Sequence, residues 1–198
     1  MEFIENYFKE MQEIISELNK EEIKSLIRYI KKVQDNEGRI FFLGVGGGAG
    51  HASHAVNDFR KICGIESYAP TDNSSELTAR INDEGWDTCY VNWLKGSKLD
   101  SNDAIFIFSV GGGNIEKKIS INLVNSIKYA QEVSACILGV VGRDGGYTYE
   151  AANACVIIPP VNSTTITPHT EAFQAVIWHL LVSHPGLQKF EMKWESVK

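Results

Sequence analysis

Four short apolar runs, each followed by a turn, constrain the fold of this 198-residue chain more than any other feature of its sequence. The runs occupy residues 40–43, 104–108, 135–141 and 154–158, and a weaker fifth run occupies 65–69. Continuous apolar runs are typical of strands buried on both faces of a parallel sheet. Helical stretches lie between them, notably 115–133. This alternation predicts an α/β fold with a parallel sheet.

Helices are expected at both ends of this core. Residues 2–35 carry apolar side chains at helical spacing on either side of Asn19-Lys20, which predicts two amphipathic helices. Their apolar stripes favour packing between subunits. A last helix is expected from about Thr170 to Ser183. The chain is therefore expected to be a single domain, with an oligomerisation segment at 1–35, an α/β core at 36–183 and a C-terminal tail at 184–198.

Composition narrows the classes of function. The formal net charge is −6, and nucleic-acid binding, which needs a basic face, is not expected. No run approaches the roughly 20 apolar residues of a membrane-spanning helix, and Met1 to Lys9 does not resemble a signal peptide. The four cysteines are widely spaced and match no zinc pattern, so free thiols in a cytoplasmic protein are expected.

Two glycine-rich turns follow the first two strong strands, Gly44-Val45-Gly46-Gly47-Gly48-Ala49-Gly50 and Ser109-Val110-Gly111-Gly112-Gly113-Asn114. Both are expected at the carboxyl ends of strands and at the start of a helix, where ligands bind in open α/β sheets. Backbone N–H groups exposed by glycine can hold an anion there. Neither turn is a dinucleotide fingerprint, because Glu66 is poorly placed as the acidic partner, and neither is a P-loop. The alternative is that both are only tight turns.

Two pairs of an imidazole and a carboxylate are candidates for chemistry. His54 and Asp58 are four residues apart and share one helix face. Glu171 and His179 are eight residues apart in the last helix, which is about 12 Å of rise. Such pairs serve general acid–base catalysis or divalent-metal binding. The alternative interpretation is two ordinary pairs without a function.

These segments, taken in order, resemble the phosphoheptose (sedoheptulose 7-phosphate) isomerases of the sugar isomerase (SIS) domain class. His54 and Asp58 fall on a His and a Glu that follow the family's Gly-Asn-Gly-Gly-Ser loop. Glu171 and His179 fall on a Gln and a His of its last helix. Three further segments resemble family motifs. Asn82–Trp86 resembles its Asn-Asp-x-Gly-aromatic segment, and Ser109–Asn114 resembles its Ser-Thr-Ser-Gly-Asn-Ser phosphate loop. Gly142–Gly146 resembles its Gly-Lys-x-Gly-Gly turn.

The resemblance implies a fold, an assembly and a reaction. The fold is a doubly wound, flavodoxin-like sheet of five parallel strands with helices on both faces, preceded by two helices. The assembly is a homotetramer with active sites at subunit interfaces. The reaction is aldose–ketose isomerisation of a phosphosugar through an enediol, with Asp58 and His179 similar to the family's base and acid. A divalent metal, expected to be zinc, would be held by His54, Asp58, Glu171 and His179. The residues expected to bind the substrate and its phosphate are Gly46, Gly47, Gly48, Asn82, Asp83, Ser109, Gly111, Gly112, Gly113 and Asn114.

Departures from the family pattern leave three functions open. Asp58 stands for a Glu and Glu171 for a Gln, which adds negative charge to a metal site. Val110, Gly111 and Gly113 replace hydroxyl or amide side chains, so phosphate would depend on backbone N–H groups. The leading hypothesis is an isomerase acting on sedoheptulose 7-phosphate or a related phosphosugar. The alternatives are a non-catalytic relative that binds a replication-initiation partner, and a sugar-phosphate-sensing regulatory domain.

Overall fold

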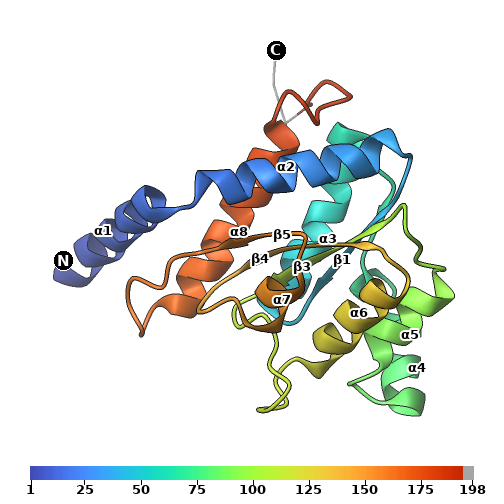
Figure 1. The fold of residues 1–198 in the computed structure, drawn as a ribbon. Helices are drawn as coiled ribbons and strands as arrows, with labels where there is room; N and C mark the ends of the chain where they lie inside the picture. Colours follow the sequence, from blue (N-terminus) through green and yellow to red (C-terminus); the bar gives the residue numbers. More distant parts are fainter. Residues whose placement is uncertain (194–198) are drawn as a thin grey trace.

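Five parallel strands form one sheet in the computed structural model, which describes residues 1–193 (Figure 1). The strands are β1 (Ile40–Gly44), β2 (Ser67–Tyr68), β3 (Ala104–Ser109), β4 (Cys136–Val141) and β5 (Ala154–Ile157). Their order is β2-β1-β3-β4-β5, and every neighbouring pair is parallel. This is the flavodoxin-like order, so the predicted fold class is confirmed.

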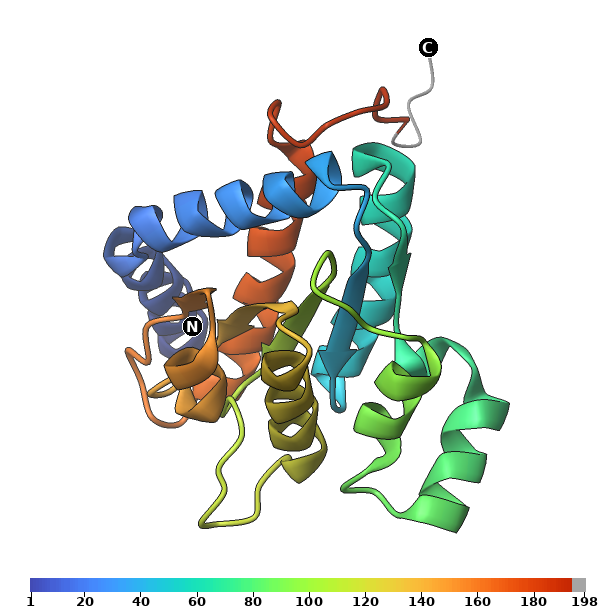
Figure 2. The same cartoon turned by 45° about the vertical axis from the view of Figure 1, so that its right-hand side comes forward.

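Helices cover both faces of the sheet (Figure 2). The helices are α1 (Glu2–Glu17), α2 (Lys20–Asp35), α3 (Gly47–Asp58), α4 (Ser74–Glu84), α5 (Cys89–Gly96), α6 (Ile121–Glu132), α7 (Gly146–Ala151) and α8 (Ile166–Ser183). Short helical turns span Phe59–Cys63, a π segment that continues α3, and Pro70–Asp72. One face of the sheet packs on α2, α3 and α8, whereas the other packs on α5, α6 and α7.

Alternation along each strand explains the two cores. Phe42 and Phe106 point into the core beneath α3 and α8, whereas Phe41 and Ile105 point into the core beneath α5 and α6. All four side chains are buried because a parallel sheet is covered on both faces. The apolar runs that predicted these strands are therefore continuous rather than alternating.

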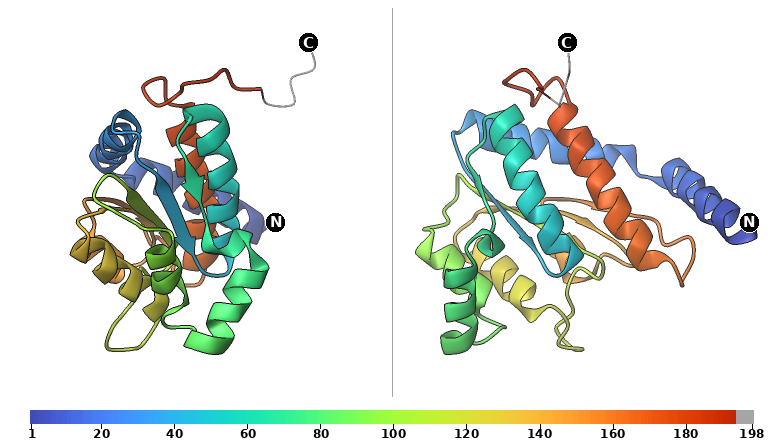
Figure 3. Two further views of the ribbon diagram at one scale, coloured as in Figure 1. Left: turned by 90° about the vertical axis from the view of Figure 1, so that its right-hand side faces the viewer. Right: turned by 180° about the vertical axis from the view of Figure 1, so that it is seen from behind.

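The break between the first two helices lies where the sequence predicted it. The side chain of Asn19 caps α2 by accepting hydrogen bonds from the backbone N–H groups of Glu21 and Glu22. Helix α2 then lies across the sheet, and α1 extends away from the body of the molecule (Figures 1 and 3). Helix α1 buries Ile14 but leaves Phe3 and Phe8 exposed by 73% and 59%.

The structure corrects the boundaries of several expected elements. The helix expected from residue 115 begins at Ile121, and the last helix begins at Ile166 instead of Thr170. The weak fifth strand is limited to Ser67–Tyr68. The part of the expected tail that the structure describes, 184–193, packs back on the body, because the N–H groups of Lys189 and Phe190 donate to the Ile62 carbonyl. Residues 194–198 of that tail lie outside the described residues.

No helix in the described part of the chain is both long and apolar enough to cross a membrane.

Candidate active site

The two glycine-rich turns meet at the carboxyl edge of the sheet. Gly44, the last residue of β1, is paired with Phe108 of β3, so both turns leave the sheet at the same level. The chain order reverses between β1 and β3, because β2 lies on one side of β1 and the later strands lie on the other. Ligands bind at such a switch point in open α/β sheets. The predicted placement of both turns on one edge is confirmed.

A cavity of about 900 Å³ opens at this edge. Five residues predicted as site residues line it, namely Gly48, Ser109, Gly111, Asn114 and Glu171. The other residues that line it are Val45, Val110, Lys117, Ile119, Ser120, Arg143, Asp144, Pro160, Ile166, Thr167 and Gln174. The cavity is thus lined by the second glycine turn, the start of α3 and the first turns of α8.

The second glycine turn is locked against the turn that precedes α7. A side chain on Gly112, which has a φ of +66°, would place its Cβ 1.8 Å from the Gly145 carbonyl oxygen. The Gly112 carbonyl accepts hydrogen bonds from the backbone N–H and the hydroxyl of Thr148, at 2.9 and 2.7 Å. Only glycine allows this approach, so backbone packing fixes the shape of the turn whose Gly111 lines the cavity.

The carboxylate of Glu171, a residue of α8, lies against the start of α3. A Cβ on Gly47 would fall 2.5–2.6 Å from its carboxyl atoms, so the missing side chain of Gly47 leaves the space that this carboxylate fills. His51, one turn along α3, interacts electrostatically with the same carboxylate. Burial lowers the pKa of His51, and the opposing effect of Glu171 is smaller. His51 is therefore held toward its neutral form.

Asn82 and Asp83, which the sequence predicted to contact substrate, lie elsewhere. Both are on α4, which buries none of its residues, and the Asn82 side chain donates a hydrogen bond to Asp83. Neither lines the cavity of this copy. Gly46 and Gly47 stand at the beginning of α3 beside the cavity without lining it.

His54, Asp58 and His179 form a cluster between α3 and α8, which lie side by side in Figure 3. Asp58 Oδ2 lies 3.8 Å from Nε2 of His54 and 4.0 Å from Nε2 of His179. Asp58 is only 2% exposed, and its Oδ2 accepts no hydrogen bond from the described residues. A buried carboxylate oxygen without a donor is costly unless a cation satisfies it.

This donor set fits a divalent cation. The Nδ1–H of His179 donates to the Ala175 carbonyl at 2.8 Å, which leaves Nε2 as the atom directed toward Asp58. Such a second hydrogen bond is usual for metal-binding histidines, since it fixes the tautomer and orients the ring. Two imidazoles and one carboxylate match the protein ligands of catalytic zinc sites.

Glu171, which the sequence placed with these three ligands, is outside the cluster. The eight-residue spacing along α8 separates it from His179 by about 12 Å of rise. On α3, His54 and Asp58 stand six and ten residues beyond Gly48, which is about 9 and 15 Å of rise. Within one copy the cluster and the cavity are therefore separate features.

Of the eleven lining residues that were not predicted as site residues, three bear on the chemistry of the cavity. Gln174 is fully buried in α8; its Nε2 donates to the Val140 carbonyl at 3.0 Å. Lys117 and Arg143 bring two positive charges to the cavity. A signal for Arg143 was present in the sequence, because it occupies the lysine position of the Gly-Lys-x-Gly-Gly turn.

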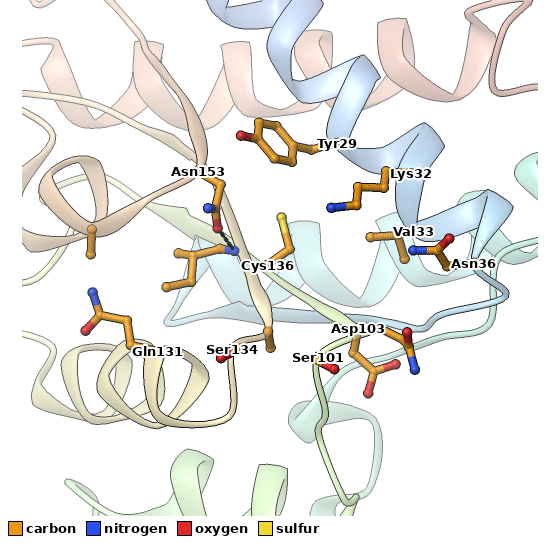
Figure 4. Close-up of a pocket in the computed structure, with 14 residues that line it drawn as sticks. Tyr29, Lys32, Val33, Asn36, Ser101, Asp103, Gln131, Ser134, Cys136 and Asn153 are labelled. Carbon is orange, nitrogen blue, oxygen red and sulfur yellow. Dashed lines mark hydrogen bonds between the residues drawn. The ribbon is translucent and has the colours of Figure 1, made fainter.

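A second hollow, of about 430 Å³, lies at the opposite, amino edge of the sheet (Figure 4). Tyr29, Lys32, Cys136 and Asn153 line it, together with Asn102, which was expected to lie outside the active site. Asn153 is already engaged, since its Oδ1 accepts from the Ile137 N–H. This hollow contains none of the predicted site residues and lies away from the carboxyl ends of the strands, so we assign the chemistry to the other edge.

The chain is similar in sequence to a lincomycin biosynthesis protein and to several proteins named phosphoheptose isomerase. It is 30% identical over 154 residues to the lincomycin biosynthesis protein LmbN of Streptomyces lincolnensis, a match that covers 74% of this chain but 56% of LmbN. It is 26% identical over 187 residues to the phosphoheptose isomerase of Aneurinibacillus thermoaerophilus, which covers 90% of this chain and 89% of that protein. The sequence matches no protein-family model.

Solved structures show the same fold. Phosphoheptose isomerase GmhA from Neisseria gonorrhoeae superimposes with a TM-score of 0.79 at 22% identity, covering 91% of this chain and 96% of that one. The resemblance to phosphoheptose isomerases and the SIS-type fold are therefore confirmed.

Proposed function

We propose that this chain is an aldose–ketose isomerase whose substrate is sedoheptulose 7-phosphate or a related phosphosugar. The observation that carries the proposal is the cavity at the carboxyl edge of the sheet. There the loop that resembles the family's phosphate loop and the carboxylate of Glu171 line one space. The phosphoheptose isomerases among the relatives support the same class of reaction.

The proposed site joins this cavity to the cluster of a second copy. The cluster and the cavity are separate within one copy, and two exposed apolar side chains lie near His179 in the sequence of α8. Val176 and Leu180, which flank His179 on α8, are 48% and 41% exposed. With the apolar side chains of α1, they favour a homo-oligomer, a dimer or a tetramer. In this arrangement a neighbouring copy contributes Asp58 and His179.

Proton transfer would use Asp58 and His179. Asp58 removes a proton from C1 of the ketose, while His179 donates a proton to the oxygen at C2, which gives the enediol. Asp58 then returns its proton to C2, and the C1 hydroxyl gives its proton to the His179 imidazole as the aldehyde forms, so both groups regain their starting protonation states. Lewis-acid polarisation of the sugar carbonyl is the chemistry that a divalent cation, zinc in our proposal, would supply when bound to His54, Asp58 and His179, and it would then replace the acid role of His179, whose Nε2 would be a ligand. Glu171 faces the hydroxyl groups of the sugar.

A reducing, cytoplasmic location is part of the proposal. It is supported by the four cysteines, which are free thiols. Burial raises the pKa of the Cys63 thiol to about 12 and that of Cys136 to about 11, so neither is a reactive thiolate at neutral pH.

The test is conversion of sedoheptulose 7-phosphate and a panel of other ketose and aldose phosphates, with and without chelator. Asp58→Asn and His179→Ala are each expected to lower turnover by about 10²–10⁴-fold. Asn102→Ala, in the amino-edge hollow, serves as the control and is expected to leave turnover unchanged. If the wild-type chain converts none of these sugars even with added divalent metal, the enzyme proposal is wrong. The binding-protein hypothesis, which the hydroxyl-poor phosphate loop favours, then takes its place.

A further inference from the structure

The loop that resembles a phosphate loop has few donors left for a phosphate. The Gly112 N–H donates to Ser109 Oγ at 3.0 Å, and the Asn114 N–H donates to the Ile119 carbonyl at 2.9 Å. Two of the four backbone N–H groups from Gly111 to Asn114 are therefore engaged within the loop. The loop also does not open a helix, because α6 begins only at Ile121. No helix dipole is therefore available to the anion, and the N–H groups of Gly111 and Gly113 are too few to hold it alone.

Two cationic side chains stand at the same end of the cavity. Arg143 lies over the loop, with its Cδ 4.0 Å from the position that a Cβ of Gly111 would take. Lys117 lies in the segment closed by the antiparallel bridge between Asn114 and Ile119, and its N–H donates to Asn114 Oδ1 at 2.8 Å. Both residues are exposed and line the cavity. Within residues 1–193 neither makes an ion pair.

The acidic groups of the cavity are placed differently. Asp144 Oδ1 accepts the Gly146 N–H at 3.3 Å, so that carboxylate is engaged in its own turn. Glu171 lies against Gly47, at the start of α3. Near the second glycine turn the cavity therefore has two cations and the carboxylate of Asp144, which also binds its own turn, whereas at α3 it has only the carboxylate of Glu171. A phosphosugar has the complementary pattern, with an anion at one end and hydroxyl donors along the rest.

We propose that the Lys117 ammonium and the Arg143 guanidinium, with the free N–H groups of the loop, bind the substrate's phosphate. This inference rests on the proposed function and deepens it, since it orients a singly phosphorylated sugar from Lys117 and Arg143 toward Glu171. The planar guanidinium offers two parallel N–H donors to phosphate oxygens, and the ammonium adds a mobile charge. Charged side chains thus take over the task of the hydroxyl groups that the loop lacks.

The experiment compares Lys117→Gln, Arg143→Gln and the double variant with wild type. Lys118→Gln is the matched control, because Lys118 is exposed next to Lys117 but does not line the cavity. Titration calorimetry with inorganic phosphate measures anion binding directly, and kinetics with sedoheptulose 7-phosphate, or with whichever phosphosugar the panel identifies, separates KM from kcat. We expect each single substitution to weaken phosphate binding about tenfold, the double variant to weaken it further, and Lys118→Gln to change nothing. KM should rise while kcat changes little, and added salt should weaken binding less in the variants.

The outcomes separate this inference from the proposed function. If wild type isomerises a phosphosugar and the double variant has an unchanged KM, the inference fails and the function stands. If wild type converts no sugar but binds phosphate through Lys117 and Arg143, the function fails and the inference stands. Undetectable phosphate binding by wild type, or an equal loss in Lys118→Gln, would overturn the inference whatever the activity.

Discussion

Nε2 of His169 lies 2.8 Å from Oε2 of Glu10 and joins α1 to the first turn of α8. His169 is only 2% exposed, and the ring of Tyr7 packs on it at 4.3 Å between centroids. Glu10 also accepts hydrogen bonds from the side chains of Asn162 and Thr165. This contact links a helix that projects from the body to the helix that carries Glu171.

Acid is expected to release α1 through this contact. The hydrogen bonds from Asn162, His169 and Thr165, in that order of effect, lower the pKa of Glu10. A carboxylate with a lowered folded-state pKa stabilises the docked helix above its unfolded pKa, and this contribution is lost as the pH falls through the folded-state value. Hydrogen exchange of the α1 amides between pH 6 and 3 measures the loss. In Glu10→Gln the α1 amides should exchange fast at every pH. In the control Glu13→Gln, an exposed position of the same helix, they should exchange as in wild type. Amides of Glu10→Gln that are as protected as those of wild type would refute the role of this contact.

The His54–Asp58–His179 cluster is expected to bind one zinc ion per chain. His54→Ala, Asp58→Asn and His179→Ala each remove a ligand and should weaken zinc binding by at least about tenfold. His184→Ala is the control, because that imidazole lies beyond the end of α8 and outside the cluster. Calorimetric titration of the metal-free protein gives the affinities. Zinc binding that survives Asp58→Asn unchanged would show that the metal lies elsewhere.

Alanine should be tolerated at Gly111 but not at Gly112. At Gly112 the new Cβ would overlap the Gly145 carbonyl in a left-handed backbone, and we expect a loss of about 2–4 kcal/mol in the free energy of unfolding. At Gly111 the nearest atom that the new Cβ would meet is Cδ of the flexible Arg143 side chain at 4.0 Å, so the change in the free energy of unfolding should stay within about 0.5 kcal/mol. Urea denaturation measures both. Equal stability of the two variants would mean that the turns are not locked together.

Charge on the exposed face of α1 should dissociate the oligomer. Phe3 and Phe8 are exposed large apolar side chains on that helix, and burying them between copies supplies the association energy in our proposal. Phe3→Glu with Phe8→Glu is expected to give monomers by light scattering at micromolar concentration. Lys9→Glu changes the charge of an exposed neighbour and should leave the assembly intact. A monomeric wild-type protein would contradict the proposed assembly.

The sequence predicts the sheet well because buried parallel strands leave a direct mark, a continuous apolar run before a turn. The segment after β3 misled the prediction for a physical reason. Ile115 and Ile119 continue the helical spacing of α6, yet both are about half exposed. Left-handed backbone at Lys118 and Ser120, with φ of 51° and 50°, ends any helix there. Exposed apolar residues and unusual dihedral angles are not visible in the spacing pattern.

The candidate site is harder to predict than the fold, because its parts depend on tertiary distances. The i, i+4 spacing of His54 and Asp58 placed them on one helix face, and the structure adds His179 from α8. Glu171 shares that helix with His179, but the approximate 12 Å of rise keeps it with the cavity. Lys117 reaches the cavity only because Asn114 and Ile119 close its segment into a loop. No local sequence pattern predicts this pairing of Asn114 with Ile119.

The interlocked turns at Gly112 and Gly145 also determine where this protein can be redesigned. A Cβ on Gly146 would in turn meet the carbonyl oxygens of Gly111 and Gly113 at 2.3 and 2.6 Å, so the two turns must be inherited together. The segment from Ile115 to Ile119 has no such constraint, since its side chains are exposed and one bridge closes it. Changes in its length would reshape the mouth of the cavity while the interlocked turns keep their form. Adaptation to longer or shorter sugar chains is therefore open to insertion and deletion at this rim alone, without a second change to rescue the fold.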